Sequence, residues 1–162
     1  MPISPYLAGI RRRVGSRLLL MPSAGAVIRD GDGRTLLLVN RETGGYMLPG
    51  GALDPGENAA TAVVREVREE CGLVVEPTHL TAVVAPWRVH YPNGDRVEYM
   101  ASLFLCRVIG GELEARDQEA SGFAWFHPQS LPPLRYPSAL WTWQPGEPAI
   151  FELHRDTPAS RE

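Results

Sequence analysis

The spacing of apolar positions changes along this chain, and each spacing predicts a different kind of element. Residues 58–72 have helical spacing, because one apolar stripe runs through Ala60, Val63, Val64, Val67 and Cys71. Asn58 is a suitable amino-terminal cap and Gly72 a suitable stop. A shorter helix is expected over residues 4–14, where one face carries Tyr6, Ile10 and Val14.

Runs typical of β-strands lie on both sides of the longer helix. Two turn signals, Asp-Gly-Asp-Gly at 30–33 and Pro-Asn-Gly-Asp at 92–95, each separate a pair of such runs. The expected strands are 24–29, 35–41, 81–91, 96–108 and 123–126, with a further helical stretch within 128–131 or 138–143. Strands before and after one long helix predict an α/β (α+β) fold, in which helices cover a central mixed β-sheet.

Length and composition predict one domain. The chain has 162 residues, of which 44% are hydrophobic, which is enough for one buried core and too few for two ordinary domains. We expect a single domain over residues 1–162, with its core at about 20–134 and a polar, proline-rich tail from about 145.

Charge and targeting signals argue against several classes of partner. A net charge of −3 does not suit a protein that binds nucleic acid through a basic face. The apolar run 18–21 ends at Pro22 and is too short for a secretory signal, and no segment approaches the roughly 18 apolar residues of a membrane span. We therefore expect a cytoplasmic protein with no nucleic-acid or membrane partner. Cys71 and Cys106 should be buried, reduced thiols, and the arginines at 11–13 should face solvent.

Three carboxylates are expected on one side of the longer helix. At roughly 100° per residue, Glu66, Glu69 and Glu70 fall in one arc beside the apolar stripe. A solvated helix face is one explanation, since Arg65 and Glu69 form an ordinary i,i+4 pair. Glu66 and Glu70, however, are like charges at i,i+4 and repel each other unless a cation lies between them. Hard oxygen ligands of this kind suit Mg²⁺ or Mn²⁺.

Nine positions around this helix follow one fixed pattern: glycine, five residues, glutamate, seven residues, then Arg-Glu-apolar-x-Glu-Glu-x-Gly-apolar. They are Gly51, Glu57, Arg65, Glu66, Val67, Glu69, Glu70, Gly72 and Leu73. The chain thereby resembles the Nudix hydrolase family, without departure from its signature. The resemblance covers about residues 20–134 and implies an α/β/α sandwich around the central mixed sheet.

The resemblance also implies a role for each residue of the pattern. The implied ligands of Mg²⁺, for which Mn²⁺ can substitute, are Glu66, Glu69, Glu70 and the backbone carbonyl of Gly50. Arg65 would belong to the catalytic site, and together with Glu57 it would hold the loop and the helix in place. Gly51 and Gly72 would have structural roles in the motif.

Glu119 is a further predicted catalytic residue. It lies in a polar loop shortly before the run 123–126, where many members of the family supply an extra metal ligand or a general base. A plain surface loop is the alternative, and the role of base would then pass to Glu66.

Four residues outside the pattern are candidates for contact with substrate. Arg41 lies at the end of a strand, where the resemblance suggests a phosphate contact, and a plain surface charge is the alternative. Tyr46 and Tyr91 could stack on a base, although aromatic residues in strands more often serve packing. Arg88 lies on the second hairpin and would contribute to a substrate rim.

These features predict Mg²⁺-dependent hydrolysis of a pyrophosphate bond in a nucleoside diphosphate linked to another moiety. The alternative is a catalytically silent module that binds a nucleotide and regulates a partner, and such a module would be expected to have lost carboxylates of the pattern. Pro86 and Tyr91 lie near, but not at, the positions that separate subfamilies. ADP-ribose-like compounds, nucleoside triphosphates and dinucleoside polyphosphates therefore all stay open as small-molecule substrates. The resemblance also favours a homodimer.

Overall fold

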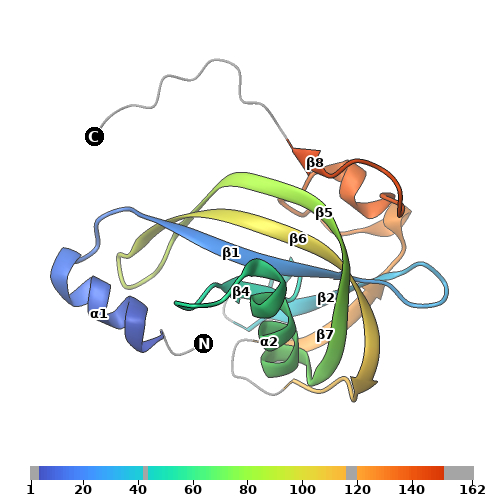
Figure 1. Ribbon diagram of the computed structural model, residues 1–162, viewed down its shortest axis with the longest axis horizontal. Coiled ribbons are helices and arrows are strands. Elements are labelled where there is room, and N and C mark those ends of the chain that lie inside the picture. Colours follow the sequence, from blue (N-terminus) through green and yellow to red (C-terminus); the bar gives the residue numbers. More distant parts are fainter. Residues whose placement is uncertain (1–3, 42–43, 116–119, 152–162) are drawn as a thin grey trace.

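The computed structural model describes residues 4–41, 44–115 and 120–151, and Figure 1 shows their arrangement. Its larger sheet has five strands in the order β4-β1-β6-β5-β8. Their bounds are Leu19–Ile28 for β1, Gly50–Ala52 for β4, Leu73–His90 for β5, Arg96–Gly111 for β6 and Ile150–Phe151 for β8. β1 runs parallel to β6 and antiparallel to β4, while β5 and β6 form a long antiparallel hairpin. The predicted central mixed sheet is thus confirmed.

Two strands of the larger sheet begin well before the residues at which the apolar pattern predicts them. β1 begins at Leu19 rather than at residue 24, and β5 begins at Leu73 rather than at residue 81. The added residues pair with β6, which lies far away in the sequence. Local alternation cannot reveal such pairing, because the pairing depends on the distant partner as much as on the strand itself.

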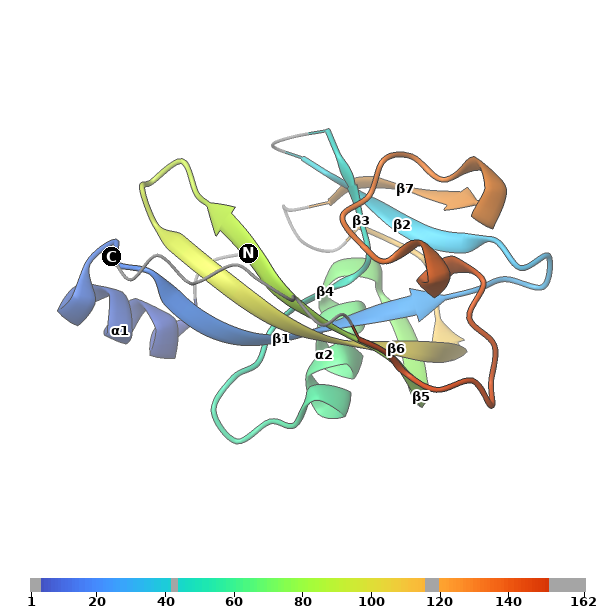
Figure 2. The ribbon, with the colours of Figure 1, turned by 90° about the horizontal axis from the view of Figure 1, so that it is seen from above.

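A second sheet and one long helix complete the core. The second sheet has the order β3-β2-β7, with bounds Tyr46–Met47, Thr35–Asn40 and Ala120–Phe126. Helix α2, Ala59–Cys71, packs against β1, β4 and β5. Figure 2 shows the second sheet at one end of the larger one. Successive residues of β1 point to opposite faces of the sheet. Ala26 and Ile28 pack in a hydrophobic cluster that contains residues of α2, whereas Val27 packs in a second cluster with Leu103 and Trp141.

The second predicted helical stretch consists of two short 3₁₀ helices. These are η1, Pro128–Ser130, and η2, Ser138–Trp141. The surrounding prolines account for their shortness, since proline cannot donate the backbone hydrogen bond that a longer helix needs. Arg29 binds this segment to β1, because its guanidinium donates to the carbonyl oxygens of Trp143 at 2.7 Å and Leu140 at 3.1 Å.

Helix α1, Pro5–Val14, lies apart from α2, beside the far end of the β5–β6 hairpin (Figures 1 and 2). We call the outer part of that hairpin, residues 84–99, the arm. Arg11 fastens α1 to the arm, because it donates to the carbonyl of Arg96 at 2.9 Å and pairs with Asp95 at 3.3 Å. The expectation of three solvent-facing arginines is therefore wrong for Arg11, whose side chain is 9% exposed, and correct for Arg12 and Arg13.

Neither helix α1 nor helix α2, nor any other helix within the described ranges, has the length and apolar content needed to cross a membrane. Cys71 and Cys106 are both buried and unbridged, as predicted. Burial raises the pKa of the Cys106 thiol to about 12.

Candidate active site

Helix α2 begins and ends where its sequence signals predict. Asn58 caps the amino end, and its side-chain oxygen accepts from the backbone N–H of Thr61 at 2.9 Å. Gly72 ends the helix in the left-handed region, with φ of 70°, which glycine adopts without the strain that a Cβ would cause. These two caps fix the register of the helix. The register sets which carboxylates face Gly50 and Gly51 in the segment before the helix, which we call the Gly-Gly loop.

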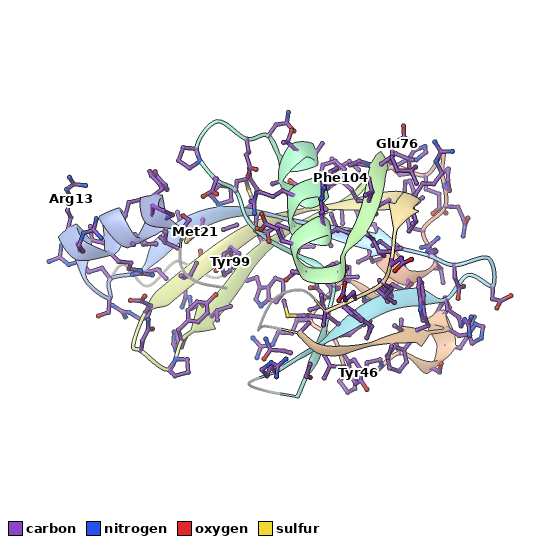
Figure 3. All side chains as sticks on the ribbon, turned by 90° about the horizontal axis from the view of Figure 1, so that it is seen from below. Arg13, Met21, Tyr46, Glu76, Tyr99 and Phe104 are labelled. Atoms are coloured by element: carbon purple, nitrogen blue, oxygen red, sulfur yellow. The ribbon has the colours of Figure 1, made fainter. Side chains whose placement is uncertain are left out.

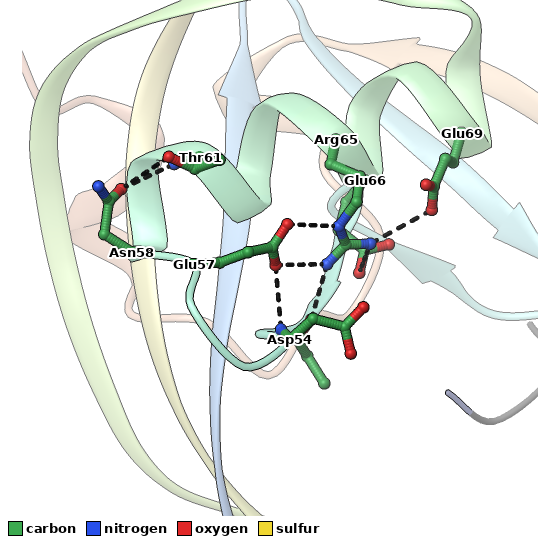
Figure 4. A network of polar contacts seen from close by, with 8 residues as sticks. Asp54, Glu57, Asn58, Thr61, Arg65, Glu66 and Glu69 are labelled. Carbon is green, nitrogen blue, oxygen red and sulfur yellow. Dashed lines mark hydrogen bonds and ion pairs between the residues drawn. The ribbon is translucent and has the colours of Figure 1, made fainter. Parts of the chain in front are cut away.

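Arg65 is the centre of the polar network in Figure 4. Its guanidinium binds both oxygens of Glu57, at 2.7 and 2.9 Å, and the backbone carbonyl of Ala52 at 3.1 Å. One further nitrogen donates to Glu66 at 2.9 Å and to Glu69 at 3.2 Å. The paired hydrogen bonds with Glu57 raise the pKa of Arg65, and the same bonds lower the pKa of Glu57. Arg65 thus joins the loop, the helix and two of the predicted metal ligands.

Glu57 also holds the turn that precedes the helix. Its second carboxylate oxygen accepts from the backbone N–H of Asp54 at 3.0 Å, in addition to its bond with Arg65. The structure therefore places Glu57 between loop and helix, bound to both.

Glu66 is the most deeply buried of the predicted ligands, with 1% of its surface exposed. One oxygen binds Arg65, while the other is buried and has no hydrogen-bond partner among the residues that the structure describes. Burial raises the pKa of Glu66, and the neighbouring charge of Arg65 opposes that rise. Gly51 makes room for this carboxylate, because a Cβ at Gly51 would lie 2.5 Å from it.

Glu70 lies against the backbone of the predicted carbonyl ligand. Its carboxylate accepts from the N–H of Gly50 at 2.7 Å. Gly50 has a φ of +148°, and a Cβ there would collide with the backbone of Ala24. The preceding carbonyl, that of Pro49, accepts from the N–H of Ala26 at 2.8 Å. The backbone next to Glu70 is thereby fixed to strand β1.

Within residues 4–41, 44–115 and 120–151, no three acidic, histidine or cysteine side chains converge closely enough to hold a metal ion as they stand. The carboxylates are turned to protein donors instead: Glu66 and Glu69 to Arg65, and Glu70 to Gly50. The donor set still fits Mg²⁺ or Mn²⁺, because it consists of hard oxygens. The buried and unpartnered oxygen of Glu66 is the observation that supports this fit, since a buried charged oxygen needs a cation or donor.

The predicted substrate residues lie in three different places. Arg41 donates to the carbonyl of Ala120 at 3.0 Å, at the edge of the second sheet. Tyr46 belongs to that same sheet, and its ring packs edge-on against Phe126 (Figure 3). Arg88 forms an ion pair with Glu98 on the arm, at 2.7 Å.

Tyr91 lies near the arm's tip, with its hydroxyl 2.8 Å from that of Tyr99. Glu119, the predicted general base, lies outside the described residues. The substrate roles of all these residues stay predictions.

Tyr99 and Tyr136 are two partly buried tyrosines that did not stand out in the sequence. Burial is the main cause that raises the pKa of each, and for Tyr99 the neighbouring Tyr91 is the next cause. Tyr136 comes from the segment after β7 and packs in one cluster with Leu48. The pairing of β5 with β6 places Tyr99 beside Trp87, and the return of the segment after β7 to the core places Tyr136 beside Trp87 as well. Neither arrangement is visible in a local pattern.

Comparisons of the sequence with known proteins find one family. The sequence model of the NUDIX domain matches residues 19–145. A "MutT-like protein" of Streptomyces ambofaciens is 37% identical over 108 residues, which are 67% of this chain and 64% of that protein. An "ADP-ribose pyrophosphatase" of Methanocaldococcus jannaschii is 36% identical over 128 residues, 74% of this chain and 70% of that protein.

A solved structure has a similar fold. The crystal structure of an ADP-ribose pyrophosphatase from Streptococcus suis superimposes with a TM-score of 0.60 at 27% identity, over 75% of this chain and 87% of the other. The chain thus spans most of that structure, but only about two thirds of the length of the Streptomyces relative.

Proposed function

Because this chain belongs to the NUDIX hydrolase family, we propose that it hydrolyses a pyrophosphate bond in a nucleoside diphosphate linked to another moiety. The observation that carries the proposal is the intact carboxylate set of α2, with a buried Glu66 oxygen that has no partner among the described residues. A binding module without catalysis would not need to keep a charged oxygen in that environment.

Mg²⁺ is the proposed cofactor, with Mn²⁺ as a substitute. Glu66, Glu69, Glu70 and the carbonyl of Gly50 would hold it, and when bound it supplies positive charge against the substrate phosphates. Arg65 orients Glu66 and Glu69 through its hydrogen bonds. A carboxylate must accept the proton of the attacking water. Glu119 is the first candidate for this base and Glu66 the second.

The substrate class is proposed from the relatives. Two of the similar proteins above are described as ADP-ribose pyrophosphatases, which favours an ADP-ribose-like compound over a nucleoside triphosphate or a dinucleoside polyphosphate. We further propose that the chain acts as one domain in the cytoplasm, on a free nucleotide rather than on nucleic acid, and as a homodimer.

A panel assay tests the proposal. The purified chain is incubated with one compound of each class in Mg²⁺, and nucleoside monophosphate and inorganic phosphate are measured. We expect monophosphate release from ADP-ribose, and its loss when a chelator removes the metal or when Glu66 is changed to Gln. Nucleotide binding without turnover of any compound would instead support the regulatory module.

A further inference from the structure

Aromatic side chains form a row along one face of the arm. Trp87 and Tyr99 are opposite each other in the register of β5 and β6, so their rings leave the sheet on the same side. The Trp87 ring centroid lies 6.5 Å from that of Tyr99 and 5.3 Å from that of Tyr136. The row continues to Tyr91 at the tip through the paired hydroxyls, and to Trp141 in the core at 5.7 Å from Tyr136.

The middle of this aromatic row is only half-buried. Ala101, two residues beyond Tyr99 on β6, is buried in the core cluster, whereas Trp87, Tyr99 and Tyr136 all keep part of their surface exposed. The indole is held in a fixed plane, because it meets Tyr99 at 63° and Tyr136 at 82°. Part of an aromatic ring of fixed orientation is therefore exposed between the core and the tip of the arm.

One end of the aromatic row lies next to the segment whose backbone binds Glu70. Tyr136 packs with Leu48, which precedes by two residues the Gly50 that binds Glu70. Tyr136 thereby connects the aromatic row to the backbone that Glu70 binds.

We propose that Trp87, with Tyr99 beside it, is the surface on which the nucleobase of the substrate stacks; this rests on the hydrolase function proposed above. Every base has a π-face, so stacking on an aromatic ring selects substrates that carry a base over diphosphates that carry only sugars. A base stacked here would leave its diphosphate to extend toward the carboxylates of α2.

The two tyrosines first considered for this role fit it less well. Tyr46 packs its ring against Phe126 in the second sheet, with the centroids 5.0 Å apart, and Figure 3 shows it well separated from Tyr99. Tyr91 shares a hydrogen bond with the hydroxyl of Tyr99, which makes it a support for the row.

Substitution of Trp87 tests the proposal through KM. Trp87→Leu removes the flat ring, Trp87→Phe keeps a smaller one, and Phe151→Leu is the matched control, since Phe151 is an aromatic residue on β8 that is 70% exposed. Each variant is assayed with ADP-ribose and with the same diphosphate carrying ribose in place of adenosine. We expect Trp87→Leu to raise KM for ADP-ribose about tenfold, because the stacking contact with the base is lost, while kcat changes less than twofold. KM for the base-free compound should not change, because that compound has no base to stack. Trp87→Phe and Phe151→Leu should stay close to the unsubstituted protein.

A binding measurement separates this inference from the proposed function. Adenosine monophosphate should quench the tryptophan fluorescence of the unsubstituted protein, and Trp87→Phe should lose most of that quenching while calorimetry gives a similar affinity. If no diphosphate is hydrolysed but this result is obtained, the function fails and the stacking surface stands. The proposal is overturned if adenosine monophosphate does not bind, if Trp87→Leu binds it as the unsubstituted protein does, or if KM rises equally for both substrates, since the row would then serve only to stabilise the arm.

Discussion

Glu66 and Glu57 are two carboxylates of one motif whose environments push their pKa values in opposite directions. Burial raises the pKa of Glu66, while the paired hydrogen bonds from Arg65 lower that of Glu57. The same arginine contacts both, so the difference comes from burial and from the number of donors each receives. The stability of the metal-free protein should therefore respond to pH in opposite ways at these two positions.

Glu66→Gln should leave the metal-free protein as stable as before at neutral pH, or more stable, while lowering hydrolysis at least about 100-fold. A raised pKa means that the fold disfavours the ionised form, so the contribution of Glu66 to stability is present at acid pH and is lost as pH rises through the folded pKa. Denaturant unfolding in a chelator, from pH 4 to pH 8, should show that the free energy of unfolding of the variant increases relative to that of the unsubstituted protein as pH rises. A relative decrease over this interval would contradict the assignment.

Glu57→Gln should lower the free energy of unfolding at neutral pH by about 1–3 kcal/mol, because charge-assisted hydrogen bonds to Arg65 are lost. The folded pKa of Glu57 is lowered, so its contribution is present above the unfolded pKa and is lost as pH falls through the folded pKa. The difference between the two proteins should therefore shrink toward acid pH. A constant difference across the same series would show that packing, and not charge, causes the loss.

At the scale of elements, helix α2 depends on its caps for its register. Asn58→Ala should destabilise the protein by about 1 kcal/mol, because the N–H of Thr61 loses its side-chain acceptor. Asn58→Asp is the control, since it keeps the acceptor oxygen and should retain most of the stability. Thermal unfolding of the three proteins measures the effect, and equal losses in both variants would mean that the cap is not the source of it.

The same helix shows how far sequence alone reaches. Its caps, its apolar stripe and its carboxylate arc are all local signals, and the structure has the helix with the predicted caps. β1 and β5, in contrast, extend beyond their predicted starts because β6 pairs with the added residues. Arg11 binds a carbonyl 85 positions away, at Arg96, so no local pattern could distinguish it from Arg12.

The residues of the candidate site also differ in whether a local signal reveals them. The signature predicts which carboxylates are brought to the Gly-Gly loop, since motif and helix are contiguous. Tyr136 and Trp87 enter the neighbourhood only through tertiary packing, one from the segment after β7 and one from the arm. Residues that recognise the variable half of a substrate commonly come from such distant segments, because they are added to a common scaffold.

For the whole molecule, metal binding should couple to stability. The proposed Mg²⁺ would bind the folded site and not the unfolded chain, so it should raise the melting temperature. The rise should be larger at pH 8 than at pH 5, because Mg²⁺ needs ionised carboxylates and the pKa of Glu66 is raised. Thermal unfolding with and without Mg²⁺ at both pH values measures this. Glu66→Gln should lose most of the shift. An equal shift in the variant would place the ion elsewhere.

The hydrogen bond from Ala26 to the carbonyl of Pro49 has a consequence for amide hydrogen exchange. Ala26 is fully buried in strand β1, so its amide should exchange with solvent only when β1 and the Gly-Gly loop separate. The amides of α1, a helix without a single buried residue, should exchange much earlier by local opening. Ala26 is therefore a reporter inside the molecule: added Mg²⁺ should slow its exchange while leaving that of α1 unchanged, which mass spectrometry of the corresponding peptides would detect.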